Sequence, residues 1–185
     1  MTTQLSMSLL IFGVVVGAAQ ESPEQLLDVV PAVNLVRYAG TWYEIARLPN
    51  RFQEQCVGEV TATYTLLDNG EIRVVNRCRK ESGEIDEAEG RARLASDDGP
   101  NTKLKVRFAP AFLSFLPFVW GDYWIIELAP DYGYAVIGEP TRKYLWILSR
   151  RPSIEESTFQ DILTRLKQKG YNLSSLVRTK QTVSP

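Results

Sequence analysis

Apolar and polar positions alternate along most of the chain in short segments, the pattern of antiparallel strands that bury one face. Turn residues separate the segments: Asp68-Asn69-Gly70 and Ser82-Gly83 suit tight hairpins, and Asp97-Asp98-Gly99-Pro100 suits a longer turn. Neighbouring strands should therefore pair antiparallel. The pattern predicts strands at 42–48, 60–67, 72–78, 85–95, 103–108, 123–128, 134–139 and 144–149.

A sheet built from consecutive hairpins keeps two unpaired edges unless it closes on itself. Closure removes both edges. The expected fold is therefore all-β, an eight-stranded antiparallel up-and-down barrel.

One helix is predicted after the strands. Phe159, Ile162, Leu163 and Leu166 recur at helical spacing before Gly170, and Ser153-Ile154-Glu155-Glu156 reads as a capping box. The apolar stripe of this C-terminal helix should pack on the outside of the barrel. Residues 176–179 are then expected to return as a short edge strand.

The N-terminal residues 9–19 are apolar, too short to cross a bilayer and of the length of a signal-peptide core. Small residues at Gly17 and Ala19 fit cleavage before Gln20. Because residues 1–8 carry no Lys or Arg, an apolar strand or helix packed on the domain is the alternative. The expected organisation is a signal peptide at 1–19, a linker at 20–34, one domain at 35–180 and a tail at 181–185.

The composition excludes several classes of binding site and active site. The 185 residues hold 21 Lys and Arg against 22 Asp and Glu, a net charge of −1, which gives no basic footprint for nucleic acid. The absence of His excludes Ser-His-Asp and Cys-His nucleophiles and His-ligated zinc. With two Cys and no clustered ligand spacing, neither a metal nor another cofactor is expected.

Export explains the two cysteines. In an oxidising compartment Cys56 and Cys78 are expected to form a disulfide, and closing such a loop contributes about 3 kcal/mol in the chain-entropy model. Two unpaired thiols are the alternative. If the strands on either side of the turn at 68–70 pair without a bulge, Cys78 lies opposite about Glu59 and not opposite Cys56. The disulfide would then require the chain before the second strand to fold back.

Four features in fixed order carry a family resemblance. Gly40-Thr41-Trp42 opens the first strand, Asp131-Tyr132-Gly133-Tyr134-Ala135 lies between the sixth and seventh, Arg150 follows the eighth, and a helix comes next. This order resembles the lipocalins, specifically the bacterial outer-membrane lipoprotein group similar to apolipoprotein D. The resemblance covers residues 35–179, although the Tyr134 segment departs from the widespread Thr-Asp-Tyr form.

The resemblance implies a barrel closed at one end by Trp42, with Arg150 lying flat on the indole, so Gly40, Trp42, Tyr134 and Arg150 are structural signatures. It also implies an apolar cup that carries a hydrophobic molecule. For this group the expected cargo is a fatty acid or lysophospholipid handled in the periplasm near the outer membrane. No Cys lies beside the predicted cleavage point to carry an acyl anchor.

Strand alternation from an inward Trp42 places Glu44 and Ala46 inward and turns Tyr43 and Ile45 outward. Glu44 is then either part of a satisfied ion-pair network or a ligand contact. Four further side chains combine an apolar or polarisable body with a hydrogen-bonding tip and are expected at the ligand: Tyr64, Asn76, Tyr123 and Trp146.

The connection 108–120 is unusually apolar for a loop, with seven large apolar side chains between Phe112 and Trp120, among them Phe115. Three interpretations fit: a lid over the cup, a contact with a membrane or donor lipid surface, or a homodimer interface. All three place this segment at the functional end of a lipid carrier.

Two rival functions remain. An enzyme would depend on Glu44 or on Asp86, Glu87 and Glu127, but no spacing singles out an acid–base pair, so catalysis is not expected. A barrel filled by its own side chains would instead bind a protein partner through 112–120.

Overall fold

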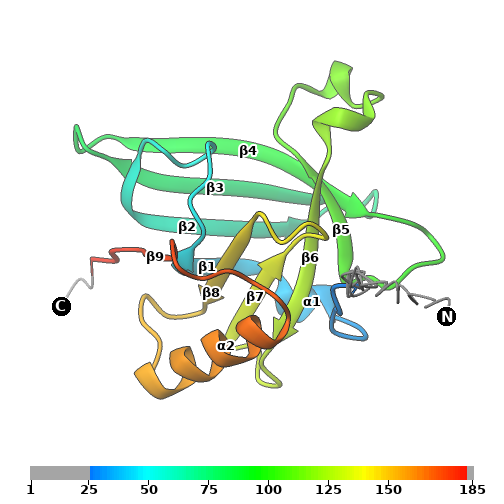
Figure 1. Cartoon of the computed structure of the whole chain (residues 1–185). Helices are drawn as coiled ribbons and strands as arrows, with labels where there is room; N and C mark the ends of the chain where they lie inside the picture. The colour runs from blue at the N-terminus through cyan, green and yellow to red at the C-terminus, as the bar shows by residue number, and fades with distance from the viewer. Residues whose placement is uncertain (1–25, 183–185) are drawn as a thin grey trace, which may run out of the picture.

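The computed structural model describes residues 26–182 of the chain. The predicted signal peptide lies outside these residues. Figure 1 shows one curved antiparallel sheet with a helix against its outer side. The strands are β1 (Gly40–Arg47), β2 (Cys56–Leu66), β3 (Ile72–Lys80), β4 (Ile85–Leu94), β5 (Lys103–Arg107), β6 (Gly121–Leu128), β7 (Tyr134–Gly138), β8 (Leu145–Ser149) and β9 (Val177–Arg178).

The sheet closes as predicted. Its order is β2-β3-β4-β5-β6-β7-β8-β1-β9, and β1 pairs with β2 as well as with β8. Every pairing is antiparallel. The eight-stranded up-and-down barrel is therefore confirmed, with β9 as the short C-terminal edge strand.

The C-terminal helix α2 (Glu156–Gln168) packs on the outside of the barrel, as expected. Phe159, Ile162 and Leu166 are buried in one apolar cluster with Val136 and Ile147 from β7 and β8. The predicted capping box is wrong: the N-cap is Glu155, with no side-chain cap. The carbonyl of Ser153 accepts from the Ser149 hydroxyl at the end of β8, so Ser153 lies in a turn before the helix begins.

A short helix that the sequence pattern did not indicate precedes the barrel. In α1 (Leu35–Tyr38) the Asn34 side chain accepts a hydrogen bond from the Arg37 amide at 3.1 Å and caps the single turn. One turn is too short to show a helical period. Its effect is to bring the Tyr38 side chain into the closed end of the barrel, where it is buried in one cluster with Trp42 and Tyr64.

A bulge in β1 changes which side chains face the interior. The pairing with β8 shifts between Glu44 and Ala46, and Ala46 joins the outer apolar cluster under α2. The prediction that Ala46 shares the inward face of Glu44 is therefore wrong, because one extra residue reverses the alternation. Arg47 faces Glu44 instead, with 2.7 Å between Nη1 and Oε1.

The predicted disulfide between Cys56 and Cys78 is present, with 5.5 Å between the Cα atoms. The chain before β2 does not need to fold back, since β2 itself begins at Cys56. Two register shifts, between Cys56 and Gly58 and between Gly58 and Thr61, carry Cys56 to the level of Lys80. Bulges thus bring the two sulfur atoms together across adjacent strands.

The end of the described chain closes the seam where β1 and β2 diverge. The Thr179 amide donates to the carbonyl of Ile45 at 2.9 Å, and the Glu59 amide donates to the carbonyl of Lys180 at 2.7 Å. The Gln181 side chain donates to carbonyls of both walls. The C-terminal segment is therefore part of the barrel wall at this point.

Candidate ligand-binding site

The closed end of the barrel is built around Trp42, which is fully buried. The Arg150 guanidinium carbon lies 3.9 Å from the centre of the Trp42 ring, and the indole Nε1 donates to the Tyr38 carbonyl at 2.8 Å. Gly40 has a φ of +96°, and a Cβ there would lie 3.3 Å from Arg150 Nη1. Glycine therefore permits both the backbone angle and the close approach of the guanidinium.

Tyr134 lies on the outer side of the barrel. Its hydroxyl accepts from Arg165 Nη2 of α2 at 3.2 Å, and this residue takes no part in the interior. The preceding Gly133 carbonyl accepts from the Arg150 amide at 2.9 Å. This segment thus anchors the connection that leads from β8 to α2.

The inward-facing residues become less buried from the closed end of the barrel toward the opposite end. We call that opposite end the mouth; it carries the β1–β2, β3–β4 and β5–β6 connections. Tyr64, Val74 and Gly90 form a buried row across β2, β3 and β4. One step nearer the mouth, the paired residues Ala62, Asn76 and Ala88 form a second inward row. Ala62 and Asn76 are partly exposed and Ala88 is exposed, although side chains on this face point into the barrel. This part of the inner face is therefore accessible to solvent, whereas the row at Tyr64 is buried.

Glu44 is buried in a network inside the wall. Its carboxylate accepts from Arg47 Nη1 and from Gln53 Nε2, each at 2.7 Å, and also from the Thr179 hydroxyl. The structure thus contains the ion-pair network that is one of the two alternatives for Glu44. Gln53 and Thr179 lie in a loop and a terminal segment, where no periodic pattern could have pointed to them.

Trp146 joins the same network from β8. Its indole Nε1 donates to Gln53 Oε1 at 2.7 Å, and its ring stacks on Tyr144 with 6.0 Å between the ring centres. Gln53 therefore links the β1–β2 connection to both walls of the barrel near the mouth. Asn76 lies apart from this network, in the partly exposed row.

Tyr64 and Tyr123, predicted from different strands, meet inside the barrel. Their hydroxyl oxygens are 2.9 Å apart, and Tyr123 is also 2.7 Å from the hydroxyl of Tyr38. Burial is the largest cause that raises the pKa of all three phenols, that of Tyr64 to about 12. Tyr38 was missed by sequence reasoning because it belongs to α1 and not to a strand.

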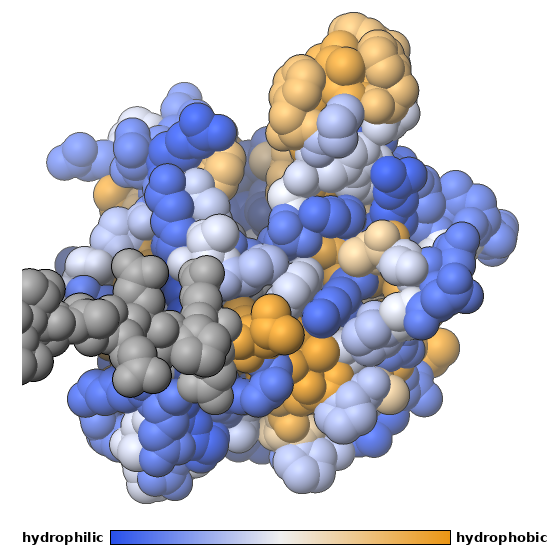
Figure 2. All heavy atoms as spheres, turned by 45° about the vertical axis from the view of Figure 1, so that its right-hand side comes forward, coloured by the Kyte–Doolittle hydropathy of each residue, from blue (hydrophilic) through white to orange (hydrophobic). Residues whose placement is uncertain are grey.

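The β5–β6 connection projects from the mouth end as an apolar knob, residues 111–119, built on the 3-10 turns η1 (Ala111–Leu113) and η2 (Pro117–Val119). Figure 2 shows it as the orange prominence at the top of the molecule. Phe112, Phe115 and Phe118 are 73%, 76% and 80% exposed. Phe112 and Phe115 therefore lie outside the barrel interior.

Trp120 anchors the knob to the outer wall. Its ring centre lies 4.2 Å from the Arg93 guanidinium carbon and 5.1 Å from that of Arg107. Its indole Nε1 donates to the Ser114 carbonyl at 2.8 Å. The knob is thus a folded structure with cationic residues at its base.

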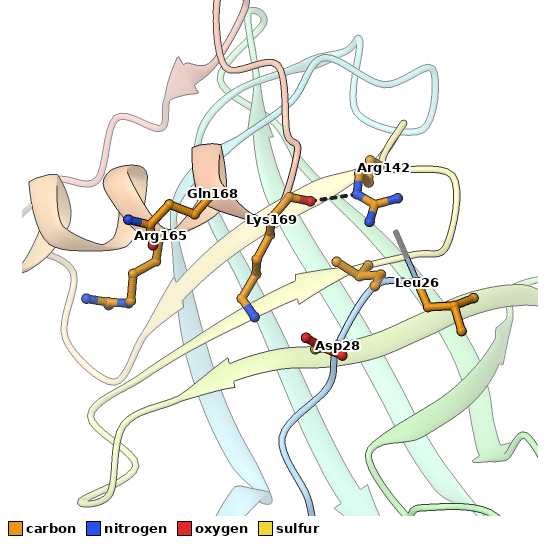
Figure 3. A pocket seen from close by; sticks show the side chains of 7 residues that line it. Leu26, Asp28, Arg142, Arg165, Gln168 and Lys169 are labelled. Carbon is orange, nitrogen blue, oxygen red and sulfur yellow. Dashed lines mark hydrogen bonds between the residues drawn. The ribbon is translucent and has the colours of Figure 1, made fainter. Parts of the chain in front are cut away.

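A hollow of about 180 Å³ lies outside the barrel, between residues 26–28 and the C-terminal end of α2. Figure 3 shows Arg142, Arg165 and Lys169 around it, with Arg142 Nε donating to the Lys169 carbonyl at 2.7 Å. Two leucines, Leu26 and Leu27, and five polar or charged residues line it.

Within residues 26–182, no three His, Cys, Asp or Glu side chains lie close enough together to hold a metal ion. None of the helices in this range has the length and apolar character needed to cross a bilayer.

Comparison with known proteins matches residues 33–181 to the lipocalin-like domain. The chain is 42% identical over 160 residues to temperature-induced lipocalin-1 of Arabidopsis thaliana, covering 86% of this chain and 85% of the relative. It is 37% identical over 170 residues to the outer membrane lipoprotein Blc of Escherichia coli (strain K12), with 90% of each chain covered. Apolipoprotein D of Mus musculus is 30% identical over 158 residues, covering 80% and 77%.

Solved structures show the same fold. Insecticyanin from the tobacco hornworm Manduca sexta matches with a TM-score of 0.63 at 23% identity, covering 87% of this chain and 88% of that one. Apocrustacyanin C1 matches with a TM-score of 0.63 at 18% identity, covering 82% and 81%.

Proposed function

The chain belongs to the lipocalin family, and from that membership we propose that it binds and carries one hydrophobic ligand, a fatty acid or a lysophospholipid, inside the barrel. The observation that carries the proposal is the contrast between the two inward rows. The row of Tyr64 and Val74 is buried, whereas Ala62, Asn76 and Ala88 retain solvent exposure on a face that points inward. An acyl chain in this space would remove the exposed wall from water.

Binding needs no covalent step. Each methylene moved out of water contributes about 0.8 kcal/mol, so an acyl chain can bind by burial alone. A charged or zwitterionic head group would stay at the mouth, where water solvates it. In the interior, the Glu44 carboxylate is committed to Arg47, Gln53 and Thr179, an arrangement that suits a structural role better than proton transfer.

The knob gives this carrier a means of meeting its cargo. Three phenylalanine rings exposed to at least 73% are more exposed than a closed lid would leave them, and the exposed cationic side chain of Arg93 lies at the base. Aromatic side chains beside basic residues suit the interface of an anionic lipid bilayer. The knob therefore docks on an anionic lipid surface, from which the ligand enters the adjacent mouth.

The proposed location is the bacterial cell envelope after export, in the periplasm at the inner side of the outer membrane. Its support is the apolar segment 9–19 and the similarity to proteins named outer membrane lipoproteins. A disulfide between Cys56 and Cys78 fits an oxidising compartment.

Native mass spectrometry of the mature protein tests ligand binding. The protein is measured as purified, after delipidation, and after adding back palmitic acid, lysophosphatidylethanolamine or a polar control such as glucose. The expected spectrum shows one retained or restored lipid per chain and no glucose adduct. The same spectrum reports whether the chain is a monomer or a dimer.

An empty protein that also refuses every added lipid would overturn the proposal. The barrel would then be one filled by its own side chains, and the knob would become the candidate interface for a protein partner. If the protein is a dimer and Phe115→Asp abolishes dimerisation, the knob contacts a second copy of the chain and not a lipid surface.

A further inference from the structure

Three tyrosine hydroxyls meet in a row inside the barrel, although they come from three distant parts of the chain. Tyr38 belongs to α1, Tyr64 to β2 and Tyr123 to β6. The oxygen atoms are 2.7 Å apart between Tyr38 and Tyr123 and 2.9 Å apart between Tyr123 and Tyr64. The row therefore crosses the interior beside Trp42, whose ring centre lies 5.0 Å from that of Tyr38.

The hydrogen atoms of this row do not all have an acceptor. Tyr123 donates to Tyr64, so Tyr38 must donate to Tyr123, and each phenol has only one proton to give. The proton of Tyr64 is left over. Among residues 26–182 no acceptor receives it, although Tyr64 is only 6% exposed. A buried donor without a partner is costly, and an arriving acceptor would remove that cost.

The unpaired donor is neutral. Burial raises the pKa of Tyr64 to about 12, and it holds the pKa of Tyr38 and Tyr123 well above the usual value as well. The row therefore stays fully protonated at physiological pH. It offers a hydrogen bond without a positive charge.

A second polar group without a partner lies one step nearer the mouth. Asn76 is the diagonal neighbour of Tyr64 on the paired strand β3, in the partly exposed row beside Ala62 and Ala88. No hydrogen bond to its side-chain amide is present within the described chain. An amide both donates and accepts. Tyr64 therefore offers a donor, and Asn76 a donor and an acceptor, on neighbouring strands of the inner face.

Three cations near the interior and the mouth have partners of their own. Arg47 pairs with Glu44 at 2.7 Å, and Lys80 lies 3.3 Å from Asp86. Arg150 donates to four backbone carbonyls beside the floor. A carboxylate placed beside Tyr64 would lose its hydration, and Arg150, whose positive charge acts on Tyr64, already serves four backbone carbonyls.

We infer that Tyr64 and Asn76 form a subsite for a neutral oxygen group, a hydroxyl or a carbonyl, on the buried part of the ligand's chain. The assignment rests on the proposed function, since it requires a ligand that enters the barrel tail first. The preferred cargo is then an amphiphile with its charged head at the mouth and a hydroxyl or carbonyl group toward the other end of its chain.

The test compares three sets of acids on the delipidated full chain: dodecanoic, tetradecanoic and hexadecanoic acid, their ω-hydroxy forms, and the corresponding dicarboxylic acids. Dissociation constants come from titration calorimetry. The specificity ratio is the dissociation constant of the plain acid divided by that of its ω-hydroxy form. At the best-fitting chain length we expect Tyr64→Phe to lower this ratio about tenfold, the equivalent of one hydrogen bond of about 1.4 kcal/mol.

Tyr43→Phe is the matched control, because Tyr43 lies on β1 outside the phenol row and should leave the ratio unchanged. Asn76→Ala removes the second polar group from a partly exposed position and should also lower the ratio, which keeps the test valid if Tyr64→Phe does not fold. The dicarboxylic acid should bind at least tenfold more weakly than the ω-hydroxy acid.

The failures are distinguishable. Plain and hydroxylated acids that bind with the same ratio in wild type and in both variants would overturn the subsite while leaving the lipid-binding function in place. A dicarboxylic acid that binds as tightly as the ω-hydroxy acid would overturn its neutral character. If no acid binds at all, the proposed function fails, and the subsite with it.

Discussion

The guanidinium of Arg150 covers the ring of Trp42 at 3.9 Å and ties together the chain that leads into β1. Its Nη2 lies within hydrogen-bonding distance of the carbonyls of Arg37, Tyr38 and Ala39, and its Nη1 donates to that of Thr41. One side chain thus joins the end of β8 to α1 and to the first strand. This contact closes one end of the barrel.

Replacing Arg150 with Lys should lower the free energy of unfolding by about 2 kcal/mol. Lysine keeps the charge, but a single ammonium group cannot stack on the indole and reach four carbonyls at once. Urea unfolding followed by tryptophan fluorescence measures the loss. Arg151→Lys, at an exposed position one residue further, is the control and should change stability by less than about 0.5 kcal/mol. Equal stability of the two variants would contradict the bridging role.

Alternation and turn residues were enough to predict the strands, the closure of the sheet and the outer helix. They could not show the bulges. A bulge at Ile45 exchanges Ala46 for Arg47 on the inner face, and its place depends on the pairing with β8 rather than on local preference. The shifts in β2 that bring Cys56 to Cys78 were hidden for the same reason.

The candidate site was predictable only where it lies on regular strands. Tyr64 and Tyr123 could be picked from their types and spacing, and the structure brings them together. Tyr38, Gln53 and Thr179 lie in a one-turn helix, a loop and a terminal segment. Their contacts with the interior depend on tertiary arrangement, which periodicity does not report.

Charging the knob should abolish contact with lipid surfaces without unfolding the barrel. Phe115→Asp with Phe118→Asp places two carboxylates at rings exposed to 76% and 80%, so the free energy of unfolding should change by no more than about 1 kcal/mol. In a flotation assay, the wild type should float with vesicles of phosphatidylglycerol and phosphatidylethanolamine, and the double variant should not.

The control for the knob is Val36→Asp, which charges an equally exposed apolar side chain on α1. This variant should float with the vesicles as the wild type does. Unchanged flotation of the double variant would disprove the membrane contact. A stability loss of several kcal/mol would show that the rings support the fold.

Removing the disulfide should destabilise the barrel by about 3 kcal/mol, the value for constraining a loop of this size in the unfolded chain. The variant is Cys56→Ser with Cys78→Ser, whose bridge joins β2 and β3. Urea unfolding of the variant should match that of the reduced wild type. If the oxidised and reduced proteins unfold at the same urea concentration, the bridge contributes nothing to stability.

The phenol row predicts a loss of stability at alkaline pH. The pKa of Tyr64 is raised to about 12 in the folded protein, against about 10 in an unfolded chain. The contribution of Tyr64 to the free energy of unfolding is fully present below about pH 10. It is lost as the pH rises toward about 12, because in this range only the unfolded chain releases the phenol proton. The slope from this group is about 1.4 kcal/mol per pH unit. In urea unfolding between about pH 9 and about pH 11.5, the free energy of unfolding should fall less steeply with pH for Tyr64→Phe than for the wild type. Parallel curves for the two proteins would contradict the raised pKa.

Glu44→Gln separates a structural carboxylate from a ligand contact. The change removes the counter-charge of Arg47, whose side chain is 12% exposed, and should lower the free energy of unfolding by about 3 kcal/mol. Glu87→Gln is the matched control: Glu87 pairs with Arg77 at 2.6 Å, but both side chains are at least 45% exposed, so the loss should stay below about 1 kcal/mol. Palmitic acid binding, measured where the variant remains folded, should change less than threefold. A large loss of affinity with unchanged stability would instead place the Glu44 carboxylate at the ligand.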